Sequence, residues 1–103
     1  MIKLKAWEPH PHTAFKVYAD IRKSAQMIEL SYLVLGPVGK LVIEPPQVLS
    51  NRKNELWQNT CFELFVGPNS SQNDPYFELN LASNGDWNFY GLSGYRKDLV
   101  ETD

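Results

Sequence analysis

The chain has little cysteine, no long apolar run and no strong excess of charge of either sign. Its 103 residues contain one cysteine, Cys61, so no disulfide can form within the chain and a small secreted disulfide scaffold is excluded. No apolar run approaches the ~18 residues of a membrane-spanning helix. The first residues alternate charged and apolar side chains, which excludes the unbroken apolar stretch of a signal peptide. We therefore expect a cytoplasmic protein without a membrane partner.

The charge balance also excludes one class of partner. Ten basic and twelve acidic residues give a net charge of −2, and they are spread along the chain. A protein that binds duplex nucleic acid needs a basic stripe, which is missing, so we expect no nucleic-acid partner. The hydrophobic share of 43% is that of a globular protein, and the length suits a single domain over residues 1–103.

Apolar and polar residues alternate in several short segments, which is typical of strands with one buried face. The segments are 2–6, 15–21, 27–35, 41–43, 60–66, 76–82 and 87–92, and turn-forming residues separate them. The polar segment 48–58 predicts a loop with one helical turn, and 69–75 predicts a surface loop. No segment longer than a turn has the helical period. The pattern predicts an all-β fold, an antiparallel β-sandwich or jelly roll.

The clearest hairpin joins the segments 76–82 and 87–92 through Asn84-Gly85, the preferred pair of a two-residue type I′ turn. That turn would place Ala82 across from Trp87, Asn80 across from Phe89, and Glu78 across from Gly91, all on one face. A three-residue turn with a G1 bulge is the alternative. It would pair Ser83 with Trp87 and move Trp87 and Phe89 to the core face. We expect the two-residue turn.

The first of these faces has the chemistry of a sugar site. Aromatic rings cover the apolar C–H face of a pyranose, and carboxylates and amides bind its hydroxyls. Glu63 lies in the middle of another strand, where it is either a solvated glutamate or a ligand acceptor with Glu78 across the sheet and Arg96 as counter-charge. The two glutamates could also be the acid–base pair of a glycosidase. Because no spacing in the chain amounts to a catalytic signature, we expect no enzyme.

Metal and cofactor chemistry have little support in the sequence. His10 and His12 alternate with prolines near the N-terminus, and two histidines are too few for a metal site. Cys61 has no placed histidine partner and is better explained as a small core residue than as a nucleophile. We therefore expect no cofactor.

Three stretches of the second half carry a family resemblance. They are Leu56-Trp57-Gln58-Asn59-Thr60-Cys61-Phe62-Glu63-Leu64-Phe65, Tyr76-Phe77-Glu78-Leu79-Asn80-Leu81, and Ser83 to Tyr90 followed by Tyr95-Arg96. In this order they resemble the DOMON-like proteins, which are similar to type 9 carbohydrate-binding modules and are often uncharacterised cyanobacterial proteins. The resemblance implies a two-sheet sandwich with a site for sugar or haem on a concave face or at its rim.

The resemblance also implies which residues bind the ligand. Sugar-binding relatives sandwich a sugar between two tryptophans, for which Trp57 and Trp87 are the candidates here. Haem would need axial donors such as Met27 with His10 or His12. None of these residues lies in a sequence context that matches the haem-binding relatives, so we expect a sugar ligand before a haem ligand. Family members generally continue beyond this chain's end. We therefore expect an incomplete sandwich and, because unpaired edges promote strand addition, a homodimer that may exchange strands.

Together these observations predict a non-catalytic carbohydrate-binding module. The predicted ligand-binding residues are Trp57, Glu63, Glu78, Asn80, Trp87 and Arg96. The alternative is a structural or protein-interaction domain that binds no small molecule.

Overall fold

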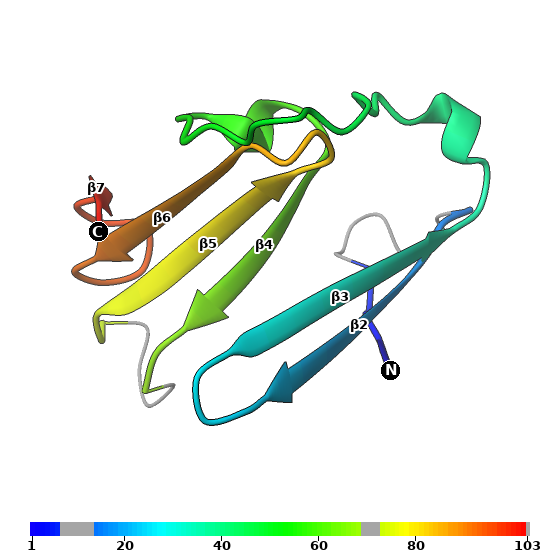
Figure 1. Ribbon diagram of the computed structural model, residues 1–103. Helices are drawn as coiled ribbons and strands as arrows, with labels where there is room; N and C mark the ends of the chain where they lie inside the picture. The colour runs from blue at the N-terminus through cyan, green and yellow to red at the C-terminus, as the bar shows by residue number, and fades with distance from the viewer. Residues whose placement is uncertain (7–13, 69–72, 103) are drawn as a thin grey trace. The chain divides into compact units, whose positions relative to one another are not determined.

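The computed structural model describes residues 1–6, 14–68 and 73–102, which form two antiparallel β-sheets (Figure 1). The strands are β1 (Ile2–Lys3), β2 (Lys16–Lys23), β3 (Ile28–Leu35), β4 (Cys61–Val66), β5 (Tyr76–Ala82), β6 (Trp87–Leu92) and β7 (Val100–Glu101). Two 3₁₀ turns, η1 (Val38–Lys40) and η2 (Leu56–Gln58), are the helical elements of these ranges, and neither is long or apolar enough to cross a membrane. The predicted all-β antiparallel fold is confirmed.

The chain divides into two compact units, residues 1–41 and 42–103. The first unit holds the sheet β1-β2-β3, in which β2 and β3 form a long hairpin with Ala19 across from Tyr32. The Ser24 N–H donates to the Met27 carbonyl oxygen at 2.9 Å and closes the hairpin turn. This is the turn that the polar residues between the two segments predict.

Two expectations for the middle of the chain have different outcomes. The return strand predicted at residues 41–43 is wrong, because the chain turns at η1 and then forms no strand before β4. Pro45 and Pro46 follow at once, and proline has no N–H to donate to a ladder. The helical turn predicted within 48–58 is confirmed as η2. The predicted histidine positions, His10 and His12, and part of the 69–75 loop lie outside the described residues.

The second unit holds the sheet β4-β5-β6-β7. We name its two faces by composition. The polar face carries Cys61, Glu63, Phe65, Tyr76, Glu78, Asn80, Ala82, Asn88, Tyr90 and Leu92, and the apolar face carries Phe62, Leu64, Val66, Phe77, Leu79, Leu81, Trp87 and Phe89. On the apolar face Phe77 stacks on Phe89, with ring centroids 5.4 Å apart. On the polar face Tyr90 and Leu92 are buried, at 2% and 5% exposure.

The β5–β6 hairpin has the three-residue turn with a G1 bulge that was the alternative, and Trp87 and Phe89 lie on the core face as that alternative implies. Its pairing is offset by two residues from the one expected for that turn. Leu81 lies across from Trp87 and Asn80 across from Asn88, so the predicted pairing of Ala82 with Trp87 is wrong. The loop has three residues, 83–85. Two backbone hydrogen bonds close this loop. The Ala82 N–H donates to the Asp86 carbonyl oxygen at 2.8 Å, and the Gly85 N–H donates to the Ala82 carbonyl oxygen at 3.1 Å. This is a type I turn with a G1 bulge, which needs positive φ only at Gly85, where φ is 100°.

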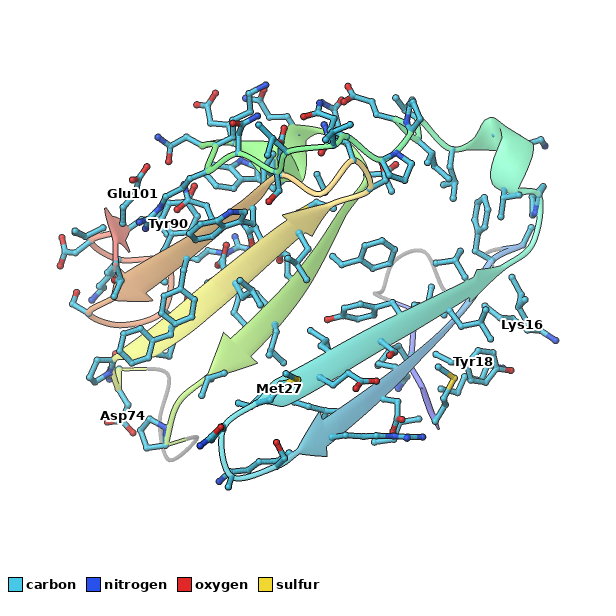
Figure 2. The ribbon with its side chains drawn as sticks, in the orientation of Figure 1. Lys16, Tyr18, Met27, Asp74, Tyr90 and Glu101 are labelled. Carbon is cyan, nitrogen blue, oxygen red and sulfur yellow. The ribbon has the colours of Figure 1, made fainter. Side chains whose placement is uncertain are left out.

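The outer edge of β6 is covered by two segments that are far apart in sequence. Residues 51–53 run parallel to the start of β6, where the Lys53 N–H donates to the Trp87 oxygen at 2.9 Å. β7 pairs with its other end, and Figure 2 shows Tyr90 and Glu101 side by side there. This edge of β6 is therefore paired along much of its length, and a polar loop before β4 supplies part of the cover.

Candidate functional site

A hollow of about 650 Å³ lies against the polar face of the second sheet. Its lining comes from β4, β5 and β6, from Trp57 in η2, and from the loop that follows β6. All of these elements belong to the unit of residues 42–103. The hollow is therefore built by one unit, from segments that the β5–β6 hairpin and the two flanking loops bring together.

Aromatic side chains form much of the wall of the hollow. Trp57 and Tyr95 are 43% and 50% exposed, so their rings present apolar surface to a ligand. Trp57 is held by an edge-to-face contact with buried Tyr90, the ring centroids being 6.0 Å apart. Two further lining residues, Phe65 and Tyr76, also contact each other, with ring centroids 6.0 Å apart. The indole is thus fixed on one side and open on the other, as ring stacking requires.

Two carboxylates stand on the floor of the hollow. Glu63 on β4 lies across from Asn80 on β5, and Phe65 lies across from Glu78, so the two glutamates are diagonal neighbours on the same face. Such neighbours usually lie ~7–8 Å apart. Burial raises the pKa of Glu63 above its ordinary value, and the charge of Glu78 raises it further. Glu63 therefore keeps its proton to higher pH than a solvated glutamate does.

Asn80 is the least expected residue of this face. It has 0% exposure, and neither its side-chain nitrogen nor its oxygen has a hydrogen-bond partner among the described residues. A buried amide without partners costs roughly 1–3 kcal/mol, and buried polar groups are bonded in most native structures. η2 lies against β4 and β5, the strands that carry Glu63 and Asn80. A hydrogen-bonding side chain thus lies unused beside the two glutamates.

Arg96 stands at the rim of the hollow, on the exposed loop after β6. Its backbone has a φ of 57°, which a non-glycine residue rarely adopts. The Arg96 N–H donates to the Tyr76 hydroxyl oxygen at 3.3 Å, and the guanidinium carbon lies 5.1 Å from the centre of the Tyr95 ring. The first contact ties the Arg96 backbone to β5, and the second places the guanidinium against the Tyr95 ring of the lining.

Trp87 does not belong to this hollow. It lies on the apolar face, opposite to Glu78 and Asn80, because Leu81 rather than Ala82 is its partner across the hairpin. The guanidinium carbon of Arg52 lies 5.2 Å from the centre of its ring. Of the six predicted ligand-binding residues, four line the hollow, namely Trp57, Glu63, Glu78 and Arg96. Asn80 lies buried beside them, and Trp57 and Trp87 do not form a facing pair.

One residue that organises the site was not predicted. Arg52, with 26% side-chain exposure, donates to the Asn88 side-chain oxygen at 2.7 Å and to the backbone oxygens of Phe89 and Thr102 at 3.0 and 2.6 Å. Asn88 has 0% exposure, and its amide nitrogen lies within 3.2 Å of three acceptors. Arg52 thereby joins β6 to β7. Its sequence context, a run of polar residues, is that of an ordinary loop and carries no signal for this role.

The remaining reactive groups give no sign of metal or nucleophilic chemistry in the described part of the chain. No group of three or more His, Cys, Asp and Glu side chains is placed there to hold a metal ion. Burial raises the pKa of the Cys61 thiol above its ordinary value, and the nearby glutamates Glu63 and Glu78 add to this. The thiol is therefore less ionised than a free one, which disfavours attack on a substrate.

Comparisons with known proteins add no relative from which a function could be transferred. No family model, no curated protein and no solved structure matches this chain. The resemblance to the DOMON-like proteins stays a prediction.

Proposed function

We propose that the hollow on the polar face binds a saccharide without catalysing a reaction on it. The observation that carries the proposal is the placement of an exposed indole, Trp57, on the same hollow as Glu63 and Glu78. A pyranose ring has an apolar C–H face and a periphery of hydroxyls. An aromatic wall beside carboxylates suits both features at once.

The proposal assigns a separate role to each group. Trp57, with Tyr95 beside it, stacks on the C–H face of the sugar. The carboxylates of Glu63 and Glu78 accept hydrogen bonds from hydroxyls, and Arg96 donates to ring or hydroxyl oxygens at the rim. A monosaccharide with about twelve heavy atoms at ~0.3 kcal/mol each would gain about 3.6 kcal/mol and bind with a Kd of about 2 mM, so oligosaccharides are the better probes.

The arrangement of the two glutamates is not specific to hydrolysis. The carboxyl groups of a glycosidase flank the scissile bond, one delivering a proton and the other attacking or activating water. Glu63 and Glu78 project from adjacent strands on one face of one sheet, a placement that any sheet with glutamates on neighbouring strands provides. The proposal assigns them to binding alone, so we expect no release of reducing ends when the protein is incubated with the oligosaccharides that it binds.

Calorimetric titration with a panel of neutral and charged oligosaccharides tests the proposal. We expect at least one to bind, and Trp57→Ala to weaken that binding about tenfold or more, because stacking surface is lost. Phe77→Ala is the matched control, since Phe77 is 44% exposed but lies on the apolar face. Its affinity should equal that of the wild type. The proposal would be overturned if no oligosaccharide of the panel bound, or if Trp57→Ala and the wild type bound with equal affinity.

A further inference from the structure

We infer that a second hollow, which shares the turn η2 with the first, binds a further unit of the same saccharide, so that the ligand is an oligosaccharide rather than a single sugar. The inference rests on the proposed saccharide binding and names the class of saccharide. The second hollow has a volume of about 280 Å³, near the lower bound of ~300 Å³ for small-molecule sites. Like the hollow with Trp57, it is built entirely by the unit of residues 42–103.

The two hollows lie toward opposite ends of the β4–β5 pair. Phe65 and Glu78 are partners across these strands, and both line the hollow with Trp57. The second hollow is lined by Ala82, at the other end of β5, and by Thr60, directly before β4. Glu78 and Ala82 are four residues apart on β5, a separation of ~13 Å along the strand. This separation is longer than one pyranose ring, so the two hollows suit different units of one saccharide chain.

The turn η2 connects the two hollows. Trp57 lines the first hollow, whereas its neighbours Leu56 and Gln58 line the second. A 3₁₀ turn has three residues per turn, so successive side chains point ~120° apart and a single turn can serve two hollows. η2 lies against both β4 and β5. A saccharide that stacks on Trp57 therefore has the second hollow beside it, at the next residue of the same turn.

The side chains of the second hollow suit sugar hydroxyls. Gln58 and Asn59 are exposed and line it, and an amide both donates and accepts, as a hydroxyl does. Lys53 adds an exposed ammonium donor to the lining. The described lining of the second hollow contains no aromatic ring. A sugar unit is therefore held there by hydrogen bonds, while stacking is confined to the hollow with Trp57.

The inner wall of the second hollow is already fixed by hydrogen bonds within the protein. Asn84 and Asp86 are 5% and 2% exposed, and the Asn84 amide donates to Asp86 Oδ2 at 3.1 Å and to Glu44 Oε2 at 2.8 Å. The Ser83 hydroxyl oxygen accepts from the Glu44 N–H at 3.0 Å. These bonds join the segment after residue 42 to the β5–β6 loop. A sugar unit that enters the second hollow does not have to order this wall, which favours binding.

Calorimetric titration with saccharides of different length tests the inference. The probes are the disaccharide and the pentasaccharide of three series of glucose units, linked β-1,4, β-1,3 and α-1,4. We expect the pentasaccharide of at least one series to bind about tenfold or more tightly than its disaccharide, which includes the effect of one net hydrogen bond in the second hollow. The remainder of the gain comes from the larger number of positions in which a longer chain can place two units against Trp57.

A double variant separates these two sources of affinity. Gln58→Ala combined with Asn59→Ala should reduce the ratio of the two affinities to about threefold, because the hydrogen bonds in the second hollow are lost. Gln47→Ala is the matched control, since this exposed amide belongs to the same unit and lines neither hollow. It should keep the ratio of the wild type. Thermal melting of each variant shows that it is folded.

The outcomes separate this inference from the proposed function. Equal affinity for disaccharide and pentasaccharide would overturn the second hollow as a binding site and leave saccharide binding beside Trp57 intact. A gain with length that keeps its full size in the double variant would also overturn the inference, because the second hollow would not be its source. If no pentasaccharide of the three series binds, the inference falls, and the proposed function falls with it when the wider oligosaccharide panel does not bind either.

Discussion

Arg52 Nε donates a 2.7 Å hydrogen bond to the Oδ1 atom of Asn88, at the edge of the sheet that carries the hollow. The same guanidinium reaches the backbone oxygens of Phe89 and Thr102. The loop segment 51–53 is thus tied at one side chain to β6 and to the end of β7, which follow it by more than 30 residues in sequence. Because Tyr90 beside them supports Trp57, this tie also holds one wall of the hollow.

Removal of the Arg52 guanidinium should therefore destabilise the whole unit. Arg52→Met keeps the apolar stem but leaves Asn88 Oδ1 and two backbone oxygens without this donor, at a cost of about 2–3 kcal/mol in the free energy of unfolding. Lys53→Met is the control, since its ammonium is 64% exposed and 3.9 Å from Asp86. It should cost less than about 0.5 kcal/mol. Urea denaturation of both variants measures the difference, and equal midpoints would contradict the role assigned to Arg52.

Asn80→Leu should make the protein more stable. Leucine has the same heavy-atom branching as asparagine and removes two buried polar atoms that lack partners among the described residues, so we expect a gain of about 1 kcal/mol in the free energy of unfolding. Thermal melting and urea denaturation measure the gain. A destabilised Asn80→Leu variant would contradict an amide without bonding partners in the folded protein.

Glu63 should give the stability of the protein a distinct pH dependence. Its pKa is raised in the folded state, so the folded protein binds this proton more tightly than the unfolded chain, and its contribution falls as pH rises above the ordinary carboxyl value of 4.5. Glu63→Gln removes that loss. The Tm of the variant should exceed that of the wild type at pH 7, with a gap that narrows toward pH 4. A gap that is constant with pH, or widest at pH 4, would contradict the assigned environment.

The oligomeric state is a separate prediction. The edge of β6 is covered, whereas in the described part of the chain the sheet ends at β4 on its other side. End strands promote pairing between copies, and we continue to propose a homodimer. Light scattering over a range of protein concentrations measures it, and a monomer at every concentration would exclude the dimer.

Strand positions could be predicted from the sequence because alternation is a local property. The hairpin register could not, because Asn84-Gly85 suits a type I′ turn and also a type I turn with a G1 bulge. The observed loop is held by contacts with distant residues. The Asn84 amide donates to a Glu44 carboxylate oxygen at 2.8 Å, and Asp86 accepts from the Asn51 N–H at 3.0 Å. No pattern within the hairpin encodes these partners.

The sequence predicts a site residue correctly where its side-chain chemistry suits a ligand and its position in the strand places it on the right face of the sheet. Glu63 and Glu78 were placed together because each lies mid-strand with a definite side of the sheet. Trp87 was misplaced by the register alone, since one residue of slip moves a side chain to the opposite face. Arg52 was missed because its partners lie 36 to 50 residues further along the chain.

Indole signals in a two-dimensional NMR titration test the central claim most directly. The three tryptophan Nε1–H signals can be assigned with Trp57→Phe and Trp87→Phe, and a bound oligosaccharide should report which face it occupies. We predict a saturable shift of the Trp57 signal and an unchanged Trp87 signal, since the two rings lie on opposite faces of the sheet. A shift of Trp87 without Trp57, or no shift of either with any oligosaccharide, would contradict saccharide binding in the hollow.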